Sequence, residues 1–292
     1  MLLEPRAGIV VQGITGREAR AMVGDMLAYG SNIVAGVTPG KGGEKVHDIP
    51  VYDTLGQVLK EHDPAVSVIS VPAPAVLEAA LEAFAHAIGL CLIMSERVPR
   101  LDASRIVAAA NGRCTVIGPN SLGLIRPGLA KVGTIGGRVD NVRRSYMAGE
   151  VAVLSRSGGM TTEIASFLTS NGIGQSIAVG VGGDPIIGSD FVQLIELLEA
   201  DPTTSAVVIF GEPGGVAEEK LARHLERNGS RLRINAFLAG RFVDRFEGMR
   251  FGHAGAIVEE GRGSVRGKEE ALRRAGVFVA EEFDDLLTGL LS

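Results

Sequence analysis

Residues 7–16 read Ala-Gly-Ile-Val-Val-Gln-Gly-Ile-Thr-Gly, and this stretch decides the fold of the first half of the chain. The apolar run at residues 7–12 is typical of a buried strand, and good helix formers fill residues 17–28. The turn Gly13-Ile14-Thr15-Gly16 lies between them. A strand, a glycine turn and a helix in this order direct backbone N–H groups toward an anion. The stretch predicts a site for a phosphorylated ligand, the alternative being an ordinary turn whose glycines only allow close packing.

The next strand argues against a nicotinamide dinucleotide as that ligand. The first turn is Gly-x-x-Gly, not the full Gly-x-Gly-x-x-Gly fingerprint. The expected second strand, residues 32–37, ends at Thr38, where a dehydrogenase would carry an acid for the ribose hydroxyls. The loop Pro39-Gly40-Lys41-Gly42-Gly43 follows. Lys41 is a candidate counter-charge for a phosphate, the alternative being a solvated surface lysine.

Strands and helices alternate through the rest of the first half. Further strands are expected at residues 65–71, 90–94 and 114–117, and helices at residues 54–62, 75–87 and 103–111. Such alternation is typical of a doubly wound parallel sheet. Loops at the carboxyl ends of parallel strands face the ligand crevice, and Ser95-Glu96 occupies one of these loops.

A second series of strands and helices follows a break. Residues 126–150 are rich in glycine and charge and lack clear periodicity, which favours a linker. Beyond it, strands are expected at residues 151–154, 176–181, 205–210, 232–238 and 277–280, each followed by a helix. The sequence therefore predicts an α/β protein with one domain at residues 1–125, a linker at 126–150 and a second domain at 151–292.

The first turn of the second series has its own anion-binding chemistry. Ser155-Arg156-Ser157-Gly158-Gly159 opens a helix and offers hydroxyl and N–H donors. The helix dipole adds roughly 0.3–1 kcal/mol for a bound anion. The alternative is a purely structural serine N-cap, because serine is among the residues preferred there.

The candidate reactive group is a histidine between small residues. Gly252-His253-Ala254-Gly255 leaves the imidazole exposed, and a reference pKa of about 6.5 makes it largely neutral at cellular pH. Such an imidazole is able to act as a nucleophile or a proton carrier, or it is a loop histidine without a role. Glu212, directly after the strand at residues 205–210, is a candidate partner whose carboxylate would fix the tautomer and raise the basicity of the other ring nitrogen.

Composition narrows the class of protein. A net charge of −5, 4% aromatic residues and no Trp argue against nucleic-acid binding. No uncharged apolar run reaches membrane-spanning length, and the first residues lack the order of a signal peptide. Cys91 and Cys114 lie in apolar runs without a C-x-x-C partner, which favours buried reduced thiols over a metal site. We expect a soluble cytoplasmic protein.

Taken together, the motifs carry a resemblance that covers essentially the whole chain. They occur in the order Val37-Thr38-Pro39-Gly40-Lys41-Gly42-Gly43, Gly118-Pro119-Asn120, Ser155-Arg156-Ser157-Gly158, Gly182-Gly183-Asp184-Pro185, Gly211-Glu212 and Gly252-His253-Ala254-Gly255-Ala256. This set resembles the α subunit of the succinate–CoA ligase (succinyl-CoA synthetase) family. The resemblance implies an N-terminal CoA-binding Rossmann-like domain and a C-terminal flavodoxin-like ligase domain. It places coenzyme A on Thr15, Gly16, Arg17, Glu18, Lys41, Met94, Ser95 and Glu96.

The resemblance also implies the chemistry. His253 matches the phosphorylated histidine of the family and Glu212 the acid that steadies it, with the phosphoryl group cradled by Ser155, Ser157, Gly158 and Gly159. A separate β subunit with an ATP-grasp domain would supply ATP or GTP with Mg²⁺, in an αβ or α2β2 assembly. The acid would become an acyl phosphate, CoA would displace phosphate, and His253 would carry the phosphoryl group between two distant sites. Glycines 248, 252 and 255 would be its hinges.

Several positions depart from the family pattern where the acid and the CoA thiol would meet. Thr162 stands where a tyrosine is usual, Ser121 replaces a cysteine, Leu122 a proline and Arg97 a glycine. We expect Thr162 to contact the acid. Succinate itself therefore stays open against malate, citrate or a sulfonated acid. A CoA-binding regulatory homologue without catalysis and, more weakly, an NAD-dependent dehydrogenase are the alternatives to a ligase.

Overall fold

The first half of the chain forms a seven-stranded sheet in the order β3-β4-β2-β1-β5-β6-β7. The computed structural model describes residues 2–241 and 263–291. The strands are β1 (Gly8–Gln12), β2 (Ile33–Val37), β3 (Lys45–Val46), β4 (Ile49–Tyr52), β5 (Pro64–Ile69), β6 (Leu90–Ile93) and β7 (Thr115–Ile117). All neighbouring strands pair in parallel except the hairpin of β3 and β4. The predicted parallel α/β sheet is thus confirmed, with one short antiparallel strand at its edge.

The helices of this half cover both faces of the sheet. They are α1 (Arg17–Tyr29), α2 (Leu55–Val58), a 3₁₀ turn (Ala73–Ala75), α3 (Val76–Ala85) and α4 (Arg100–Ala110). Strands buried on both faces read as continuous apolar runs, and Ile9, Val10 and Val11 are all fully buried. The helix expected at residues 54–62 is only one turn long, and Thr54 caps it by accepting from the N–H of Gln57.

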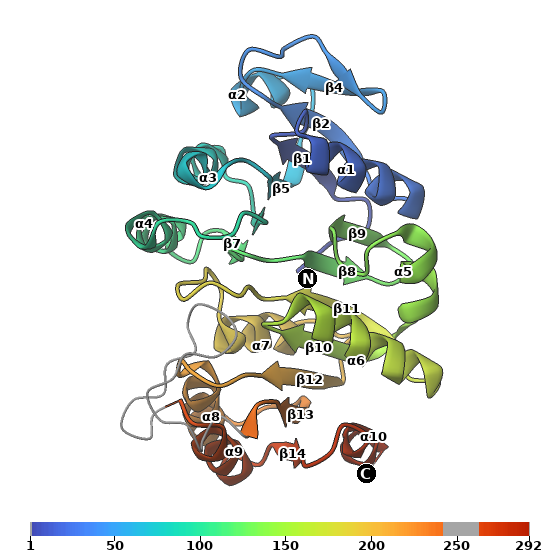
Figure 1. Ribbon diagram of the computed structural model, residues 1–292, viewed down its shortest axis with the longest axis vertical. Coiled ribbons are helices and arrows are strands. Elements are labelled where there is room, and N and C mark those ends of the chain that lie inside the picture. Colours follow the sequence, from blue (N-terminus) through green and yellow to red (C-terminus); the bar gives the residue numbers. More distant parts are fainter. Residues whose placement is uncertain (1, 242–262, 292) are drawn as a thin grey trace.

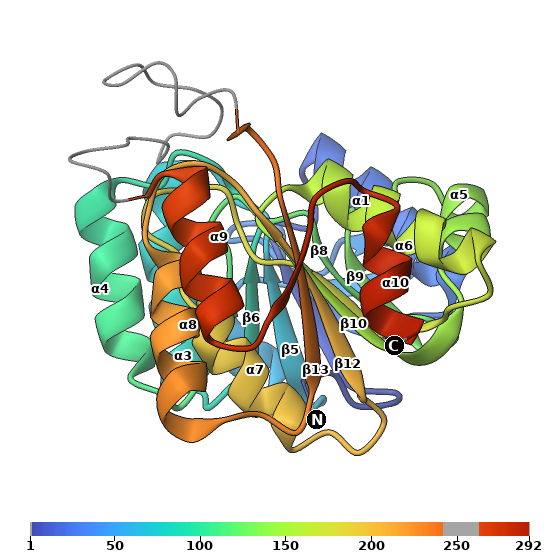
Figure 2. The same cartoon turned by 90° about the horizontal axis from the view of Figure 1, so that it is seen from below.

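The second half forms another seven-stranded sheet, in the order β14-β13-β12-β10-β11-β8-β9. Its strands are β8 (Gly123–Arg126), β9 (Ala130–Gly133), β10 (Ala148–Ser155), β11 (Gln175–Gly180), β12 (Ala206–Gly211), β13 (Arg233–Leu238) and β14 (Phe278–Ala280). Its helices are α5 (Val139–Ser145), α6 (Gly158–Ser170), α7 (Phe191–Glu199), α8 (Ala217–Asn228), α9 (Val265–Arg274) and α10 (Asp285–Leu291). Figure 2 shows α3, α4, α8 and α9 on one side of the two sheets and α1, α5, α6 and α10 on the other.

The segment that we expected to be a linker is instead structured. Within residues 126–150 lie β9, α5 and the start of β10, and β8 pairs antiparallel with both β11 and β9. These strands are four residues long, too short to show a clear period, and the buried Lys131 interrupts the apolar signal of β9. The hairpin of β8 and β9 therefore extends the second sheet. The domain boundaries at residues 125 and 151 stay a prediction.

The two sheets share one packed core. Figure 1 shows the first sheet above the second, with β8 and β9 at the edge of the second sheet that faces the first. Met22 and Met26 of α1 belong to the same buried apolar cluster as Val132 of β9. Ser31 Oγ also donates to the carbonyl of Lys131 at 2.6 Å and accepts from its N–H at 3.0 Å. The two sheets are therefore held in a fixed relation by packing and by hydrogen bonds.

The described ranges, residues 2–241 and 263–291, contain neither a membrane-spanning helix nor a cluster of metal ligands. None of their helices is long and apolar enough to cross a membrane. Nor do they contain a group of three or more His, Cys, Asp or Glu side chains that could hold a metal ion. Cys91 and Cys114 are buried free thiols.

Candidate functional site

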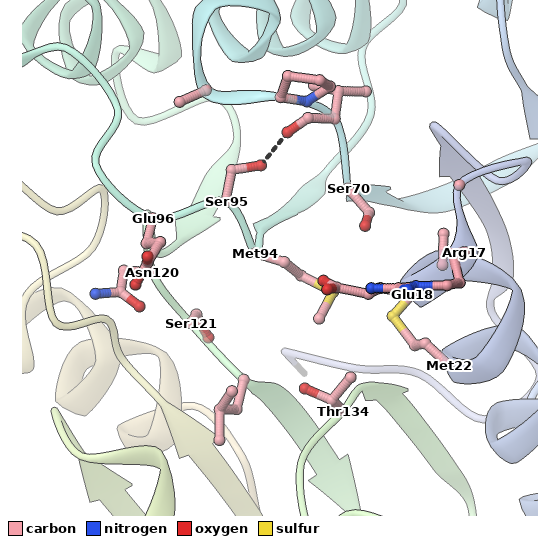
Figure 3. Close-up of a pocket in the computed structure, with 16 residues that line it drawn as sticks. Arg17, Glu18, Met22, Ser70, Met94, Ser95, Glu96, Asn120, Ser121 and Thr134 are labelled. Atoms are coloured by element: carbon pink, nitrogen blue, oxygen red, sulfur yellow. Dashed lines mark hydrogen bonds between the residues drawn. The ribbon is translucent and has the colours of Figure 1, made fainter.

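A cavity of about 640 Å³ opens at the carboxyl ends of β1, β5 and β6 (Figure 3). Six of the eight residues that we expected around coenzyme A line it: Gly16, Arg17, Glu18, Met94, Ser95 and Glu96. They come from two separate loops, one after β1 and one after β6. Ligands of parallel α/β sheets bind at this edge, because the loops that follow the strands converge there.

The turn after β1 needs glycine at its first position. Gly13 has a φ of +82°, and a Cβ there would lie 2.3 Å from the carbonyl oxygen of Ser70, at the end of β5. The turn thus lies directly against the neighbouring strand end. Gly16 caps α1 without a side-chain hydrogen bond. The first N–H groups of a 13-residue helix are therefore left without a side-chain cap beside the cavity, as an anion site requires.

The loop after β6 forms the facing wall. The N–H of Met94 donates to the carbonyl of Ile69 at 3.1 Å, which continues the parallel ladder one step beyond β6. Ser95 Oγ donates to the carbonyl of Val71 at 2.5 Å and so ties this loop to the end of β5 (Figure 3). Glu96 is exposed, and its carboxylate lies 3.6 Å from Nε of Arg97. The wall is therefore rigid at Ser95 and open to solvent at Glu96.

Thr15 and Lys41 do not line this cavity. Thr15 Oγ1 donates to Oγ1 of Thr38 at 3.2 Å. Lys41 is exposed on the loop after β2, and its Nζ lies 3.0 Å from Glu44. That loop borders a separate hollow of about 360 Å³ whose lining includes Gly42, Gly43 and Tyr52. The roles of Thr15 and Lys41 toward a ligand stay predictions.

The cavity is also lined by polar residues outside the eight expected around coenzyme A: Ser70, Asn120, Ser121 and Thr134. Ser70 directly follows β5, and loops at the carboxyl ends of parallel strands face the ligand crevice, so its position was predictable from the sequence. Thr134 follows β9, inside the segment expected to be a linker. Asn120 bridges the two halves of the chain, because its N–H donates to Ser95 and its carbonyl accepts from Gly183. Reasoning from local sequence does not reveal such cross-sheet contacts.

A second set of loops meets at the carboxyl edge of the second sheet. In the parallel register Ser155 pairs with Gly180 and with Phe210, so the loops after β10, β11 and β12 start side by side. The first of these loops is the turn expected to bind phosphate. Ser157 caps α6 by accepting from the N–H of Met160 at 3.4 Å.

The two serine hydroxyls of this turn are engaged locally. Ser155 Oγ donates to the carbonyl of Ser157 at 2.7 Å and accepts from its N–H at 3.0 Å. Ser157 thus has the structural role of an N-cap that the sequence offered as the alternative to phosphate binding. A Cβ built on Gly159 would meet no atom within 4 Å, so the backbone is approachable at that residue.

Arg156 joins the three loops of this edge. Its Nη2 donates to the carbonyl of Asp184 at 3.1 Å and its Nε to Gly182 at 3.4 Å. A Cβ on Gly215, in the loop after β12, would lie 3.5 Å from its Nη1. The guanidinium group thus holds the loop after β11 against the start of α6. In the sequence, Arg156 stands out only as part of the Ser-Arg-Ser-Gly-Gly motif, and its contacts to the other loops become visible in the fold.

The expected acid partner, Glu212, follows β12 directly at this same edge. His253, the expected nucleophile, lies outside the described residues, as do Gly248, Gly252 and Gly255. The described residues on either side of that range are both bonded to the second half of the chain, Gly263 to the turn of Glu212 and Arg241 to α9. Gly214 donates its N–H to the carbonyl of Gly263 at 2.8 Å, and Arg241 Nε lies 2.8 Å from Oε1 of Glu269 on α9.

The pKa of a second carboxyl group near Gly263, that of Glu219, is shifted by its surroundings. Burial raises the pKa of Glu219, a residue of the first turn of α8, and the neighbouring carboxylate of Glu218 adds to the shift. Its Oε1 accepts the N–H of Gly263 at 3.2 Å. The charged Lys268 acts in the opposite direction on the pKa of Glu219.

One side chain joins the cavity of the first sheet to the edge of the second. Leu122 lines the cavity and is 43% exposed. A Cβ added to Gly158 would lie 2.2 Å from its Cδ1. The two candidate ligand sites are therefore neighbours that share a wall at Leu122.

Thr162, the expected acid-contacting residue, lies one turn into α6 and is partly buried. Its Oγ1 is 2.9 Å from the hydroxyl of Tyr146, which directly follows α5. Burial raises the pKa of the Tyr146 phenol, so the phenol stays neutral. A tyrosine hydroxyl from a different element thus lies next to position 162.

Comparisons with known proteins agree on both halves of the chain. Residues 6–97 match the family described as "CoA binding domain", and residues 154–278 match the family described as "CoA-ligase". The cavity of the first sheet lies within the first match except for residues 120–134, and the turn at residue 155 lies within the second.

Relatives that resemble the chain over its whole length carry related names. The chain is 42% identical to a succinate–CoA ligase [ADP-forming] subunit alpha of Methanothermobacter thermautotrophicus, over 96% of this chain and 92% of that protein. It is 41% identical to the ADP-forming sulfoacetate-CoA ligase subunit SauD of Bilophila wadsworthia, over 97% and 96% respectively.

Among solved structures, an ATP citrate lyase of Methanosaeta concilii in complex with (3S)-citryl-CoA matches with a TM-score of 0.91 at 26% identity. The match covers 99% of this chain and 50% of the lyase chain, so this chain spans half the length of that protein.

Proposed function

This chain belongs to the succinate–CoA ligase alpha-subunit family, and from that premise we propose that it binds coenzyme A and carries a phosphoryl group on His253 during the synthesis of an acyl-CoA. Its relatives are named alpha subunits of ADP-forming CoA ligases, which makes the chain a CoA ligase subunit. The phosphohistidine and the identities of the acid and of the partner are our proposals.

The observation that carries this proposal is the shared wall at Leu122. The cavity that we assign to coenzyme A and the turn that we assign to the phosphoryl group are neighbours, because Leu122 lines the first and lies against Gly158 at the start of the second. A thiol and an acyl phosphate must meet within about 3–3.5 Å for the acyl group to be transferred. The CoA thiol, entering along the cavity, would reach the acid near Leu122 and Ser121.

The cavity fits a phosphorylated thiol carrier. The free N–H groups at the start of α1 and the guanidinium of Arg17 would bind the pyrophosphate of CoA. The pantetheine arm would follow the wall of Met94 and Ser95 toward Asn120. CoA supplies the thiol, and this chain supplies its orientation.

In the proposed reaction His253 would take the γ-phosphoryl group of ATP or GTP through a ring nitrogen, forming a P–N bond as the bond to the leaving nucleoside diphosphate breaks. Glu212 would accept a hydrogen bond from the other ring nitrogen and so stabilise the charge that develops on the ring. The carboxylate of the acid would then take the phosphoryl group from His253 as an acyl phosphate. CoA would finally attack the acyl carbon, and inorganic phosphate would leave.

The proposed partner is a β subunit with an ATP-grasp domain that holds the nucleotide and Mg²⁺, in an αβ or α2β2 assembly. Support comes from the relatives, which are named as one subunit of a larger enzyme. The proposed acid is a small dianion. One relative is named for sulfoacetate, and a structural neighbour was solved with citryl-CoA, so succinate, malate, citrate and a sulfonated acid are the candidates.

The test is an acyl-CoA synthesis assay on the complex purified with its natural partner. The complex would receive Mg-ATP, CoA and, in turn, succinate, malate, citrate and sulfoacetate, and the acyl-CoA would be separated by chromatography. We expect one acid to give product in the wild type. His253→Ala should abolish product and leave the Kd for CoA unchanged. Turnover that survives in His253→Ala would overturn the covalent mechanism, and CoA binding without product from any acid would favour a regulatory CoA-binding protein.

A further inference from the structure

A lysine that the proposed mechanism does not use lies fully buried beneath the turn that carries Glu212. Lys268, on α9, has no exposed surface. Its ammonium group has three hydrogens and finds three acceptors: the carbonyl oxygens of Glu212 and Gly214, each at 2.7 Å, and Oε2 of Glu218 at 2.5 Å. Two of these three bonds go to the backbone of a single turn. The ammonium group therefore holds the backbone of this turn in place, and a change in its position would move the turn.

The carboxylate that neutralises Lys268 is equally enclosed. The side chain of Glu218 is 1% exposed. On its other side Glu218 faces the residue before Glu212, since a Cβ on Gly211 would lie 2.8 Å from Oε1. Only glycine fits at position 211 without displacing the carboxylate. The ion pair thus fills the space directly below residues 211–214.

The same turn is bonded to the residue at which the chain re-enters the described structure. Gly214 donates to the carbonyl of Gly263, and Gly263 donates to Oε1 of Glu219. Lys268 lies five positions beyond Gly263, one turn into α9. The turn of Glu212, the first turn of α8 and the start of α9 are therefore connected through a few short bonds centred on Lys268.

We propose that Lys268 is a positioning residue for phosphoryl transfer: its ammonium group fixes the backbone at Glu212 and Gly214 and thereby sets the carboxylate of Glu212 relative to the chain that leads to α9. The inference rests on the proposed function, in which Glu212 steadies His253. A buried ion pair is seldom more stabilising than apolar residues of the same volume. The two carbonyl bonds to one turn are what an apolar replacement would lose.

The test is single-turnover phosphorylation of the complex by Mg-ATP, in which rate constant and amplitude are read separately. Lys268→Met combined with Glu218→Leu removes both charges, so neither is left unpaired, and it also removes the two bonds to the turn. We expect full labelling amplitude with a rate constant lower by about 100-fold, the order of magnitude for a misplacement of about 1 Å. A purely structural role would lower the amplitude through loss of folded protein and leave the rate constant unchanged.

A second buried ion pair in the same half of the chain is the matched control. Arg126 Nη1 lies 3.2 Å from Oδ2 of Asp201, and their side chains are only 6% and 3% exposed. Arg126 ends β8, which runs antiparallel to β11, and so lies at the opposite edge of the sheet from Glu212. Arg126→Met combined with Asp201→Leu should leave the labelling rate constant unchanged. A wild-type rate constant in the Lys268 and Glu218 double variant would overturn the proposal.

Amide hydrogen exchange separates this proposal from the proposed function. In the double variant at positions 218 and 268 the amides of residues 211–215 should exchange at least about tenfold faster, as expected when a turn loses its hydrogen-bonded anchor. If the wild-type complex is not phosphorylated, the proposed function fails. The exchange experiment alone then decides whether Lys268 anchors the turn at residues 211–215. Unchanged protection of residues 211–215 would then overturn the anchoring by Lys268.

Discussion

The side chain of Leu122 lies against Gly158 so closely that a Cβ on residue 158 would fall 2.2 Å from Cδ1 of Leu122. Leu122 leads from the first sheet into β8, and Gly158 is the first residue of α6. The contact therefore joins a loop that lines the cavity of about 640 Å³ to the helix start at the edge of the second sheet. The shared wall thus consists of a glycine on one side and an apolar side chain on the other.

The first prediction concerns this contact. Gly158→Ala should lower the free energy of unfolding by about 1–3 kcal/mol, because the new methyl group overpacks against Leu122. Gly159→Ala is the control, since a Cβ there meets no atom within 4 Å. It should be neutral or stabilising by up to about 1 kcal/mol, because alanine restricts the unfolded chain. Denaturant unfolding of both variants measures the difference.

A double-mutant cycle checks the cause of that destabilisation. Leu122→Ala should recover most of the stability lost in Gly158→Ala, because it removes the atoms that clash. Additive losses in the double variant would show that the two residues do not interact and would contradict the shared wall.

The second prediction concerns CoA affinity. Arg17→Gln should weaken CoA binding by about tenfold, equivalent to about 1.4 kcal/mol, because a charge-assisted hydrogen bond to a phosphate is lost at a site partly screened by water. Arg105→Gln is the control, since Arg105 is exposed on α4 and lies 3.6 Å from Asp102, away from the cavity. Titration calorimetry measures both affinities. Equal Kd values for the two variants would place CoA elsewhere.

The third prediction concerns pH. Burial raises the pKa of Glu219 above the usual value of a glutamate, so the folded protein holds this proton more tightly than the unfolded chain. The stability contributed by the protonated group is fully present below the unfolded pKa and is lost as pH rises through the folded pKa. Glu219→Gln keeps an acceptor for Gly263 and removes the titration. The free energy of unfolding of Glu219→Gln relative to the wild type should therefore increase as pH rises from the unfolded to the folded pKa of Glu219. Above the folded pKa the difference should stay constant.

Denaturant unfolding from pH 4.5 upward measures this difference, and Glu226→Gln, at an exposed position of the same helix, is the control. A pH profile for Glu219→Gln that follows the control would show that burial of Glu219 does not perturb its titration.

The fourth prediction concerns the acid. Thr162→Tyr should shift the preference of the enzyme toward succinate, because it replaces the small side chain that bonds to Tyr146 with the residue usual in the family. Thr162→Val should keep the size of the side chain but cost about 1 kcal/mol of stability, since the Tyr146 hydroxyl loses its partner. The ratio of kcat/KM values across the acid panel is the measurement. The same ratios in Thr162→Tyr and in the wild type would remove position 162 from acid selection.

Much of the fold was predictable because parallel strands buried on both faces leave continuous apolar runs in the sequence. β1, β2, β6 and β12 begin and end within a residue or two of the expected limits. The hairpin of β8 and β9 was not predictable, because its strands are short and a buried lysine stands in one of them. Its position beside β11 is decided by tertiary packing against α1.

The site was predictable where a strand end or a helix start defined it, as for Gly16, Arg17 and Ser95. Lys268 shows what local sequence conceals. It opens the charged run Lys-Glu-Glu, which is typical of a solvated helix face, and yet it is fully buried. Its acceptors at Glu212 and Gly214 lie more than fifty positions earlier in the chain. Only the fold brings them together.

The most direct test of the central claim is phosphorylation of His253 in the complex with its natural partner. After incubation with Mg-ATP, the subunit should carry acid-labile, base-stable phosphate on residue 253, and CoA together with one acid of the panel should discharge it as acyl-CoA and inorganic phosphate. His253→Ala should take up no label. A nucleotide-binding complex that takes up no label on residue 253, yet still makes acyl-CoA, would contradict the account.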